Sequence, residues 1–557
     1  MRSNSALHVL LLVTLCGAIY FSYLGSVPFF DKGEPREALA VQDIVHRGEW
    51  LVPMKRATIP SKPPLFHWSA TLVARLTGSM TEVTIRFPSA LYATLGILLI
   101  YWLGRRIYDA KTGLLGAAIL ATMMTYQDQA LSARVDMTLC FFVTLSLALF
   151  FSLYRGHLKN PLWFYVFYAV VGIGTLAKGP LSVVLTALVA GTFALVERRW
   201  ELIRKFSFHP GIILMIVLAS AWYVIAVTRG GEGFFDRQIL EENLSRFVGG
   251  SGHSRPVYYY IPYLFSQTLP WGFFLPILLW DLFRTGFREN GDAVFLKLWF
   301  LVMFVFFSVS VGKRPVYLLP LYPAVALLVA AWFYGPPKPS RSRLVVYRFF
   351  GAFAAVTGSL LLINTLGALW SHDPGWFFAP IEELLRPKDR ANVMAVRSQL
   401  DDFGWKFTLL SLCAAALWLS IVRFLWHGRM RAVAHHLVAI TLIQATVGWS
   451  VVMPAIAQGK SYRDFMSEVN RRVKPEEKLY VHGDFNDDAV VFYRGDAIER
   501  LDEPLETLTP KLGRGDAYVI LPERRAQSRN LPAPLIKSEG RGPEGDAPLM
   551  LMRADLP

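Results

Sequence analysis

The sequence predicts a polytopic α-helical membrane protein with a small α/β domain at its C-terminal end. Of the 557 residues, 54% are hydrophobic and only 18% are charged, and the mean hydropathy is +0.37. Apolar runs of about twenty residues, the length that crosses the hydrocarbon core of a bilayer, recur along most of the chain. They stop near residue 458, where short apolar segments separated by Gly, Asp and Pro take over.

We expect about thirteen transmembrane helices, which together make one domain over residues 1–458. The first apolar stretch is longer than the core of a typical signal peptide and no cleavage motif follows it, so we interpret it as a retained anchor. The expected spans are 6–25, 84–103, 112–126, 137–154, 161–177, 180–197, 211–228, 258–281, 293–311, 316–334, 346–370, 406–424 and 433–454.

The basic residues give the expected orientation, because cytoplasmic loops of membrane proteins are enriched in Lys and Arg. With the N-terminus in the cytoplasm, the connections on that side are short and basic, as at Arg105-Arg106 and Arg198-Arg199. The long connections, about 26–83, 229–257 and 371–405, then lie on the outer side. This topology and anionic lipids account for the net charge of +15, so we expect no nucleic acid partner.

The tail that the last span delivers to the outer side, residues 459–557, is expected to form an α/β domain. Ser461–Val473 has the apolar periodicity of a helix. The expected strands are Leu479–Val481, Ala489–Tyr493, Ala517–Leu521 and Leu549–Met552. The three cysteines of the chain all lie in apolar spans without metal-site spacing, so they predict neither a disulfide nor a cysteine metal site.

The polar segment at 27–88, between the first two spans, is predicted to form one wall of an active site. It and the rest of the outer face are rich in cations, against the usual bias, and such cations suit phosphate groups. Paired structural charges and snorkelling side chains would give the same pattern. The cations are Lys32, Arg36, Lys55, Arg56, Lys62, Arg86, Arg134, Lys178, Arg246, Arg255, Lys313 and Arg314. Tyr317 and Tyr322 follow Lys313 closely, so they are candidates for substrate contact.

The carboxylates of the same face are candidates for acid–base chemistry. Asp31 lies at the membrane boundary, where partial desolvation would raise its pKa and suit it to proton transfer. Glu34 and Glu37 are three residues apart, so on a helix they share a face, and a salt-bridged amphipathic helix is the better interpretation for Glu37. Asp136 begins the fourth span and is either a helix N-cap or an active-site group.

These residues fall into an ordered series of short motifs between residues 31 and 323. The motifs are Asp31-Lys-Gly-Glu34-Pro-Arg36-Glu37, Gly48-x-Trp50-x-x-Pro53, Lys62-Pro63-Pro64-Leu65, Glu82 with Arg86-Phe87-Pro88, Ala133-Arg134-Val135-Asp136, Lys178-Gly179-Pro180, Arg246-Phe247 with His253, Leu269-Pro270-Trp271, and Lys313 with Tyr317, Leu319-Pro320 and Tyr322-Pro323. As a set they resemble the polyprenyl-phosphate-sugar glycosyltransferases of the GT-C type. The closest likeness is to the branch of the lipid A aminoarabinose transferases and protein O-mannosyltransferases. The family's adjacent Asp-Glu pair is broken here, so either Glu34 or Glu37 replaces the second acid.

The resemblance implies a donor, an acceptor and a location. The donor is 4-amino-4-deoxy-L-arabinose linked to undecaprenyl phosphate, and the acceptor is a phosphate of lipid A. The reaction takes place at the periplasmic side of a Gram-negative inner membrane, and its product gives resistance to polymyxin and other cationic peptides. We expect the protein to act as a monomer in contact with membrane lipids.

The resemblance also implies roles for the candidate residues. The leaving group is polyprenyl phosphate, whose developing charge needs electrostatic stabilisation. The residues expected to bind it are Lys62, Arg246 and Tyr322, with Arg36, Arg134, Lys313 and Tyr317 behind them. Asp31, Glu34 and Asp136 are the catalytic candidates. Because an acceptor phosphate is already ionised near neutral pH, Asp31 could instead hold the ammonium group of the sugar or a metal ion.

Other functions and a metal site remain open on the sequence. A transferase with another sugar, or with protein Ser/Thr as acceptor, would use the same motifs. A lipid-linked sugar flippase would show internal repeats and charges at mid-membrane, whereas here the ionisable residues gather at one interface. We expect no required cofactor, although Glu82 and His253 could bind zinc together because carboxylate and imidazole suit that ion.

Overall fold

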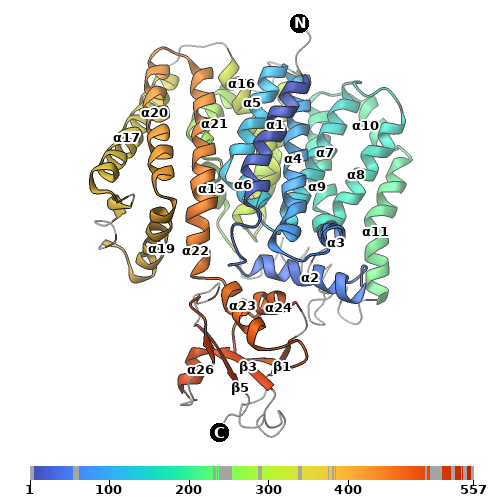
Figure 1. Ribbon diagram of the computed structural model, residues 1–557. Helices are drawn as coiled ribbons and strands as arrows, with labels where there is room; N and C mark the ends of the chain where they lie inside the picture. The colour runs from blue at the N-terminus through green and yellow to red at the C-terminus, as the bar shows by residue number, and fades with distance from the viewer. Residues whose placement is uncertain are drawn as a thin grey trace.

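The computed structural model is a helical bundle with a small sheet domain at one end (Figure 1). The fold class predicted from the sequence is confirmed. The structure describes residues 5–53, 62–229, 254–285, 291–335, 341–373, 375–378, 384–495, 498–501, 517–528, 534–540 and 548–553, and the single positions 234, 236, 382 and 542.

The bundle consists of long apolar helices joined by short turns. Within the described ranges, nine segments are long and apolar enough to cross a bilayer, and four shorter apolar helical stretches lie among them. The helices are α1 Ser5–Ile19, α4 Glu82–Ile107, α5 Ala110–Thr122, α6 Met124–Ala130, α7 Val135–Tyr154, α8 Leu162–Lys178, α9 Leu181–Val196, α10 Trp200–Ser207, α11 Gly211–Arg229, α13 Tyr260–Gln267, α14 Leu275–Thr285, α15 Gly291–Val309, α16 Tyr322–Tyr334, α17 Arg341–Ser371, α19 Pro387–Phe403, α20 Trp405–Trp426, α21 Met430–Val447 and α22 Met453–Gln458.

Two of the expected spans are divided. The span expected at 258–281 is not one helix, because α13 ends at Gln267 and a 3-10 turn, η4 Trp271–Phe274, precedes α14. Pro270 lies between them, and a proline has no backbone N–H to continue a helix. The span expected at 112–126 ends at Thr122, since Met123 is extended and α6 starts a new helix.

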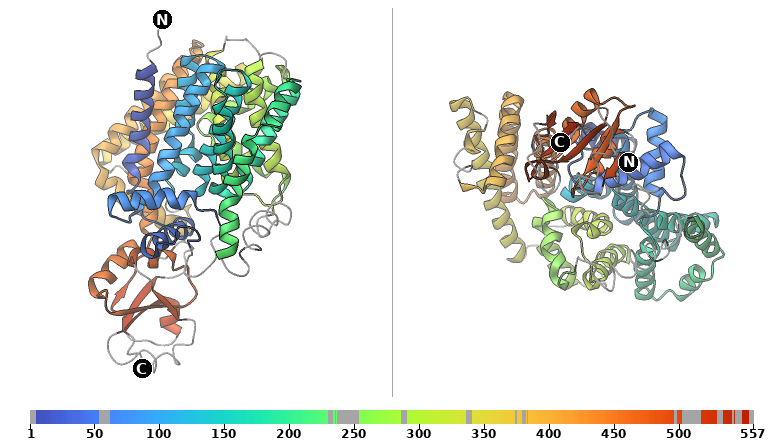
Figure 2. Two further views of the ribbon diagram at one scale, coloured as in Figure 1. Left: turned by 90° about the vertical axis from the view of Figure 1, so that its right-hand side faces the viewer. Right: turned by 90° about the horizontal axis from the view of Figure 1, so that it is seen from below.

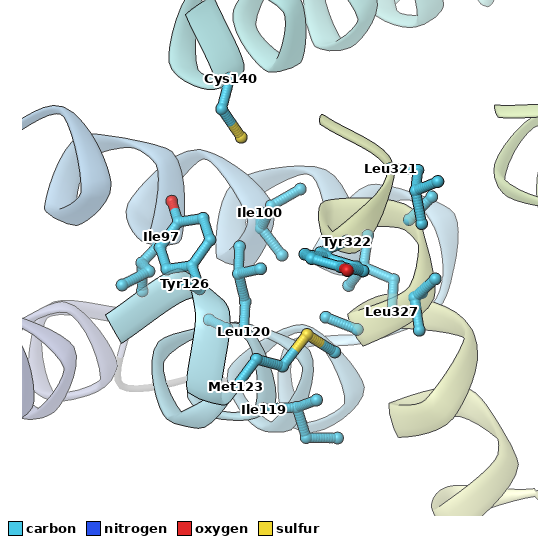
Figure 3. Packing of buried hydrophobic residues seen from close by; sticks show 14 of the residues in the cluster. Ile97, Ile100, Ile119, Leu120, Met123, Tyr126, Cys140, Leu321, Tyr322 and Leu327 are labelled. Carbon is cyan, nitrogen blue, oxygen red and sulfur yellow. The ribbon is translucent and has the colours of Figure 1, made fainter. Parts of the chain in front are cut away.

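The core of the bundle is formed by α4, α5, α7 and α16, whose buried side chains meet in one cluster (Figure 3). Ile97, Leu120 and Leu327 are members of this cluster from three different helices. α4 and α5 approach closely at Gly113, where a Cβ atom would lie 2.8 Å from the backbone oxygen of Tyr101. Glycine is therefore required at this crossing.

The long connection expected at 26–83 contains two helices that do not cross the bundle, α2 Gly33–Arg47 and α3 Leu65–Thr77. α2 lies across the end of the bundle, next to the C-terminal domain (Figures 1 and 2). It ends at Gly48, whose φ of +70° is the left-handed conformation that commonly closes a helix. This arrangement holds the polar segment against the ends of the spanning helices.

The C-terminal domain is a five-stranded sheet in the order β2-β1-β3-β5-β4. β1 is parallel to β2 and β3, whereas β5 is antiparallel to β3 and β4. The elements are α23 Arg463–Arg472, β1 Lys478–His482, α24 Asp488–Arg494, β2 Glu499–Leu501, β3 Ala517–Pro522, α26 Glu523–Ser528, β4 Ile536–Lys537 and β5 Leu549–Arg553.

One of the strands expected in this domain is wrong. Ala489–Tyr493 belongs to helix α24, which is closed by Gly495 in a left-handed conformation (φ +82°). The run from 488 to 492 is buried at every position, so its sequence carries neither the alternation of a half-buried strand nor a helical stripe. A short, fully buried apolar run does not distinguish a strand from a helix.

The C-terminal domain and the bundle share apolar packing. Phe29, in the segment before α2, and Leu39 of α2 belong to the same buried cluster as Phe465 of α23 and Phe492 of α24. The rings of Phe29 and Phe492 lie 5.1 Å apart. The domain is therefore packed against the segment that carries the candidate site.

Candidate active site

A cavity of about 370 Å³ lies where α2, the start of α7 and the turn η5 Pro315–Leu321 meet. A π-helical turn, η7 Gly448–Val452, contributes Trp449 to its wall, and such turns often occur at functional sites. The charged residues that line it are Asp31, Glu34, Arg36, Glu37, Lys62, Arg86, Asp128, Arg134, Asp136, Lys178 and Arg314. Most of the residues singled out in the sequence thus lie around one space.

Asp31 is held by the start of α2 and by Arg134. One carboxylate oxygen accepts hydrogen bonds from the backbone N–H groups of Gly33 and Glu34, at 2.7 and 2.9 Å. The other oxygen lies 2.5 Å from an Arg134 nitrogen. Burial alone would raise the pKa of Asp31, but Arg134 and the two N–H groups outweigh it, so the pKa lies below its ordinary value. The raised pKa expected from the sequence is wrong, because the membrane boundary also supplies a cation and two donors.

Gly33 makes room for this ion pair. A Cβ atom at position 33 would overlap the guanidinium group of Arg134. Arg134 caps the start of α7, and Asp31 with the neighbouring acids holds the pKa of its guanidinium above the ordinary value despite burial. A glycine at position 33 of the motif is therefore required for steric reasons.

Glu34 forms a buried ion pair with Arg86. Its two oxygens accept from Arg86 at 2.7 and 2.8 Å, and the backbone N–H of Ala133 donates to it at 2.8 Å. Arg86 also donates to the backbone oxygens of Leu24 and Val27. The network ties α2, α4 and the segment before α7 together behind Asp31.

Asp136 is paired with Lys178. The Lys178 ammonium group donates to its carboxylate and lies 4.6 Å from the centre of the Tyr317 ring. The helix-cap interpretation of Asp136 is wrong, because Arg134 occupies the N-cap position and Asp136 lies inside the first turn of α7. Tyr317 lines the cavity, as expected for a residue that contacts substrate.

Glu37 is an ion-pair residue of α2. It accepts from Arg36 at 2.8 Å and from His67 of α3 at 2.9 Å. Burial would raise the pKa of Glu37, but these partners hold it below its ordinary value. The salt-bridged amphipathic helix expected for this residue is what the structure contains. Arg36 still lines the cavity, as does Lys62.

Lys313 and Tyr322 do not line the cavity. The Lys313 ammonium group donates to the backbone oxygens of Arg255 and Ser310, and burial lowers its pKa. Its neighbour Arg314 lines the cavity instead. Tyr322 lies in the apolar core with Leu321 and Leu327 (Figure 3), and its hydroxyl donates to the cavity residue Gln267. Their contact with phosphate, expected from the sequence, stays a prediction.

The metal-site residues are only partly described. Glu82 accepts from the Tyr493 hydroxyl at 2.8 Å and from Arg463 at 3.5 Å, so its carboxylate is already neutralised by donors of the C-terminal domain. His253 and the phosphate candidate Arg246 lie outside the described residues. Among the residues that are described, no three His, Cys, Asp or Glu side chains are grouped to hold a metal ion. Zinc binding by Glu82 and His253 stays a prediction.

The cavity residues that were not singled out in the sequence include Asp128 and Gln129 of α6, and Gln267 at the end of α13. Asp128 and Gln129 lie in the stretch 127–136, which was expected to be a short loop on the outer side. Gln267 lies in the middle of a span that was expected to be continuous. For Gln267, a polar residue inside an apparently apolar segment was the available signal.

Comparisons with known proteins agree with this architecture. Residues 61–225 match the family model described as dolichyl-phosphate-mannose-protein mannosyltransferase. An undecaprenyl phosphate-α-4-amino-4-deoxy-L-arabinose arabinosyl transferase of Pseudomonas fluorescens is 27% identical over 499 residues, which cover 82% of this chain and 87% of the relative. One from Pectobacterium atrosepticum is 28% identical over 393 residues, 69% of each chain. The crystal structure of ArnT from Cupriavidus metallidurans bound to undecaprenyl phosphate superposes with a TM-score of 0.76, at 20% identity, over 98% of this chain and 97% of that one.

In fold and in sequence, the chain is thus similar to polytopic membrane glycosyltransferases. Within that class, the chain is similar to the arabinosyl transferases that use undecaprenyl phosphate-linked 4-amino-4-deoxy-L-arabinose, as the motifs predicted.

Proposed function

We propose that this protein transfers 4-amino-4-deoxy-L-arabinose from undecaprenyl phosphate to a phosphate group of lipid A. The observation that carries the proposal is one cavity, at the end of an apolar bundle, that Lys62, Arg36 and Arg314 line together with Asp31 and Asp136. Both substrates join a phosphate to lipid tails, so the reaction needs cations at bilayer height beside an apolar surface. The likeness to relatives with that printed activity supports the same assignment.

Lys62, Arg36 and Arg314 are the residues we propose for the donor phosphate. In a single displacement, the bond between the anomeric carbon and the oxygen of the polyprenyl phosphate breaks, and an oxygen of the acceptor phosphate forms the new bond to that carbon. The leaving phosphate gains negative charge, which fixed cations in a site screened from water stabilise strongly. Arg246 is a further candidate outside the described residues.

The acids of the site serve in positioning rather than in proton removal. The acceptor phosphate is ionised near neutral pH, so no strong base is needed. Asp31, with its lowered pKa, keeps Arg134 in place at the cavity wall, and Asp136 does the same for Lys178. Glu34 belongs to the network that supports Asp31. No step in this proposal passes through a metal ion.

We place the site on the periplasmic side of the inner membrane. The helix ends and connections at the end of the bundle that holds the N-terminus are basic, as at Arg105-Arg106 in the last turn of α4 and Arg198-Arg199 after α9. The cavity and the C-terminal domain lie at the other end (Figure 1). The positive-inside rule then puts the N-terminus in the cytoplasm and the cavity outside it.

The decisive experiment is transfer by the purified protein in detergent or nanodiscs, with mass spectrometry of lipid A as the readout. We expect the mass of one aminopentose to be added to a lipid A phosphate when the undecaprenyl phosphate donor is supplied. Unmodified lipid A in the presence of that donor would refute the proposal. Transfer to a protein hydroxyl, or donor movement across the membrane without transfer, would identify the alternative transferase or the flippase.

Lys62→Ala tests the phosphate site within the same assay. We expect it to lower transfer by about 100-fold or more, since removing one charge partner of a phosphate in a screened site costs several kcal/mol. Lys111→Ala, at the start of α5 on the opposite end of the bundle, is the matched control and should transfer normally. Normal transfer by Lys62→Ala would mean that the phosphate binds elsewhere.

A further inference from the structure

The cavity contains a carboxylate that the proposed mechanism does not use and that forms no ion pair with the described residues. Asp128, on α6, is an exposed residue that lines the cavity together with the cations proposed for phosphate. Its Oδ2 accepts a hydrogen bond of 2.8 Å from the side-chain nitrogen of the adjacent Gln129. In the described part of the chain, no Lys, Arg or His forms an ion pair with Asp128. The other acids of the cavity are paired: Asp31 with Arg134, Glu34 with Arg86, Glu37 with Arg36 and His67, and Asp136 with Lys178.

Gln129 lines the same cavity and carries a buried acceptor. An ionised carboxylate only accepts hydrogen bonds, so the amide nitrogen of Gln129 must be the atom that faces Asp128. This fixes the amide orientation and leaves Oε1 as the remaining polar atom. That oxygen is buried and has no hydrogen-bond donor in the described structure. The Gln129 side chain as a whole is only 7% exposed. A buried acceptor without a donor is costly, and a ligand that donates hydrogen bonds would satisfy it.

The chemistry of the pair specifies the ligand. A negative carboxylate and an amide oxygen both accept, so their partner carries several N–H or O–H donors and is favoured if it is positive. A primary ammonium group has three donors and one positive charge. Desolvation by the surrounding chain raises the pKa of Asp128 and outweighs the opposing effects of the Gln129 hydrogen bond and the Arg134 charge. A bound cation would stabilise the ionised carboxylate.

The ammonium group of the sugar needs such a partner. The sequence suggested Asp31 for this role, but both oxygens of Asp31 are occupied, by the start of α2 and by Arg134. We infer that Asp128 and Gln129 bind the ammonium group of the transferred amino sugar and so select an amino sugar over a neutral one. This inference rests on the proposed function, because it assigns the sugar-recognition part of that same site.

The test compares two donors that differ at one position of the sugar. One is undecaprenyl phosphate-linked 4-amino-4-deoxy-L-arabinose, and the other is undecaprenyl phosphate-linked L-arabinose, in which a hydroxyl replaces the amine. The measured quantity is the ratio of their kcat/KM values with lipid A as acceptor. We expect the wild-type protein to prefer the amino sugar by about 10- to 100-fold, the range for a charged hydrogen-bonded pair. Asp128→Asn should lower the preference at least about tenfold, and Gln129→Met by a smaller factor.

The ratio separates recognition from folding, since a fraction of misfolded protein lowers both rates equally. Asp402→Asn makes the same chemical change at an exposed position of α19 that does not line the cavity, and it should keep the wild-type ratio. An unchanged ratio in Asp128→Asn or in Gln129→Met would overturn the inference, even if both rates fall. Equal use of the two donors by the wild-type protein would also overturn it while leaving the transferase activity standing. Transfer from neither donor would refute the proposed function itself.

Discussion

The hydroxyl of Tyr493, in the C-terminal domain, accepts a hydrogen bond of 2.9 Å from the backbone N–H of Phe29, in the segment that leads to Asp31. The same hydroxyl donates to Glu82, at the start of α4, at 2.8 Å. Arg86, one turn further along α4, stacks on the Phe29 ring at 5.1 Å. One side chain of the C-terminal domain therefore fixes the backbone two residues before a cavity carboxylate.

Tyr493→Phe is expected to weaken both the fold and the reaction. The variant leaves the Phe29 N–H without its acceptor and Glu82 without one donor, at a cost of about 1–3 kcal/mol in the free energy of unfolding. Because catalysis depends on the placement of the groups around Asp31, we expect kcat to fall about three- to tenfold, with KM less affected. Thermal unfolding in detergent and steady-state transfer measure the two effects.

Tyr480→Phe is the matched control for this change. Tyr480 is on strand β1 of the same domain, packed against the apolar cluster of the sheet face that includes Val519 and Met550. We expect it to keep the wild-type kcat. Equal losses in the two variants would show that only the stability of the domain matters and that Tyr493 does not position the cavity.

Gly33→Ala is expected to separate Asp31 from Arg134. The added methyl group would overlap the Arg134 guanidinium, so the side chain must move and the ion pair must lengthen. We predict at least a tenfold loss of kcat in the transfer assay, since the charged groups at the wall would be displaced. Gly17→Ala in α1 is the control, because a Cβ atom there meets nothing within 4 Å, and it should leave transfer unchanged.

The Asp31 ion pair predicts a defined dependence on pH. Its pKa is lowered in the folded protein, so its contribution to stability is present above the unfolded-state pKa of about 4 and is lost as the pH falls through the folded-state pKa. Asp31→Asn should therefore unfold at a lower temperature than the wild type at pH 7, and the difference should narrow below about pH 4. A difference that stays constant across this range would contradict the assigned ionisation.

The same shift predicts the pH–rate profile. Asp31 remains ionised throughout the range from about pH 6 to 8, so it should contribute no titration step to kcat there. We therefore expect the dependence of kcat on pH to show no rise or fall between about pH 6 and 8 that is caused by titration of Asp31. A base-limited limb with a midpoint near pH 6 that disappears in Asp31→Asn would show that Asp31 takes up a proton during the reaction.

The elements with a strong local signal could be predicted from the sequence. Runs of about twenty apolar residues identified the spans. Short apolar segments separated by turn residues identified β1, β3 and β5. The strand expected at Ala489–Tyr493 was wrong because the burial of this segment comes from its contacts with α2 and α23, which other parts of the chain supply. The break at Pro270 was visible in the sequence, but apolar length outweighed it in the prediction.

The sequence predicted which residues line the cavity better than it predicted the role of each one. Topology placed Asp31, Lys62, Arg134, Asp136 and Tyr317 on one face, and the structure brings them around one space. The partner of each charge depends on distances that no sequence spacing contains. Lys313 and Arg314 are adjacent in the sequence. Lys313 donates to backbone carbonyl groups, whereas Arg314 lines the cavity. Asp128 was overlooked because it follows directly on an apolar run.

The buried pair of Glu34 and Arg86 predicts strong coupling in a double-mutant cycle. Both side chains are almost completely buried, so Glu34→Gln or Arg86→Met alone leaves one charge without its partner, at a cost of about 3–5 kcal/mol in the free energy of unfolding. The double variant removes both charges, and we expect it to be more stable than the sum of the single losses by at least about 1 kcal/mol. Chemical unfolding in detergent provides the four free energies.

The exposed pair of Glu468 and Arg471 on α23 is the control for that cycle. Its nitrogen–oxygen distance is 3.0 Å, but the Arg471 side chain is 74% exposed, so water and salt screen the interaction. Glu468→Gln and Arg471→Met should each change stability by less than about 1 kcal/mol and should show little coupling. If the Glu34–Arg86 cycle were equally weak, the network behind Asp31 would not hold α2 against α4. Substrate placement would then depend on the C-terminal domain alone.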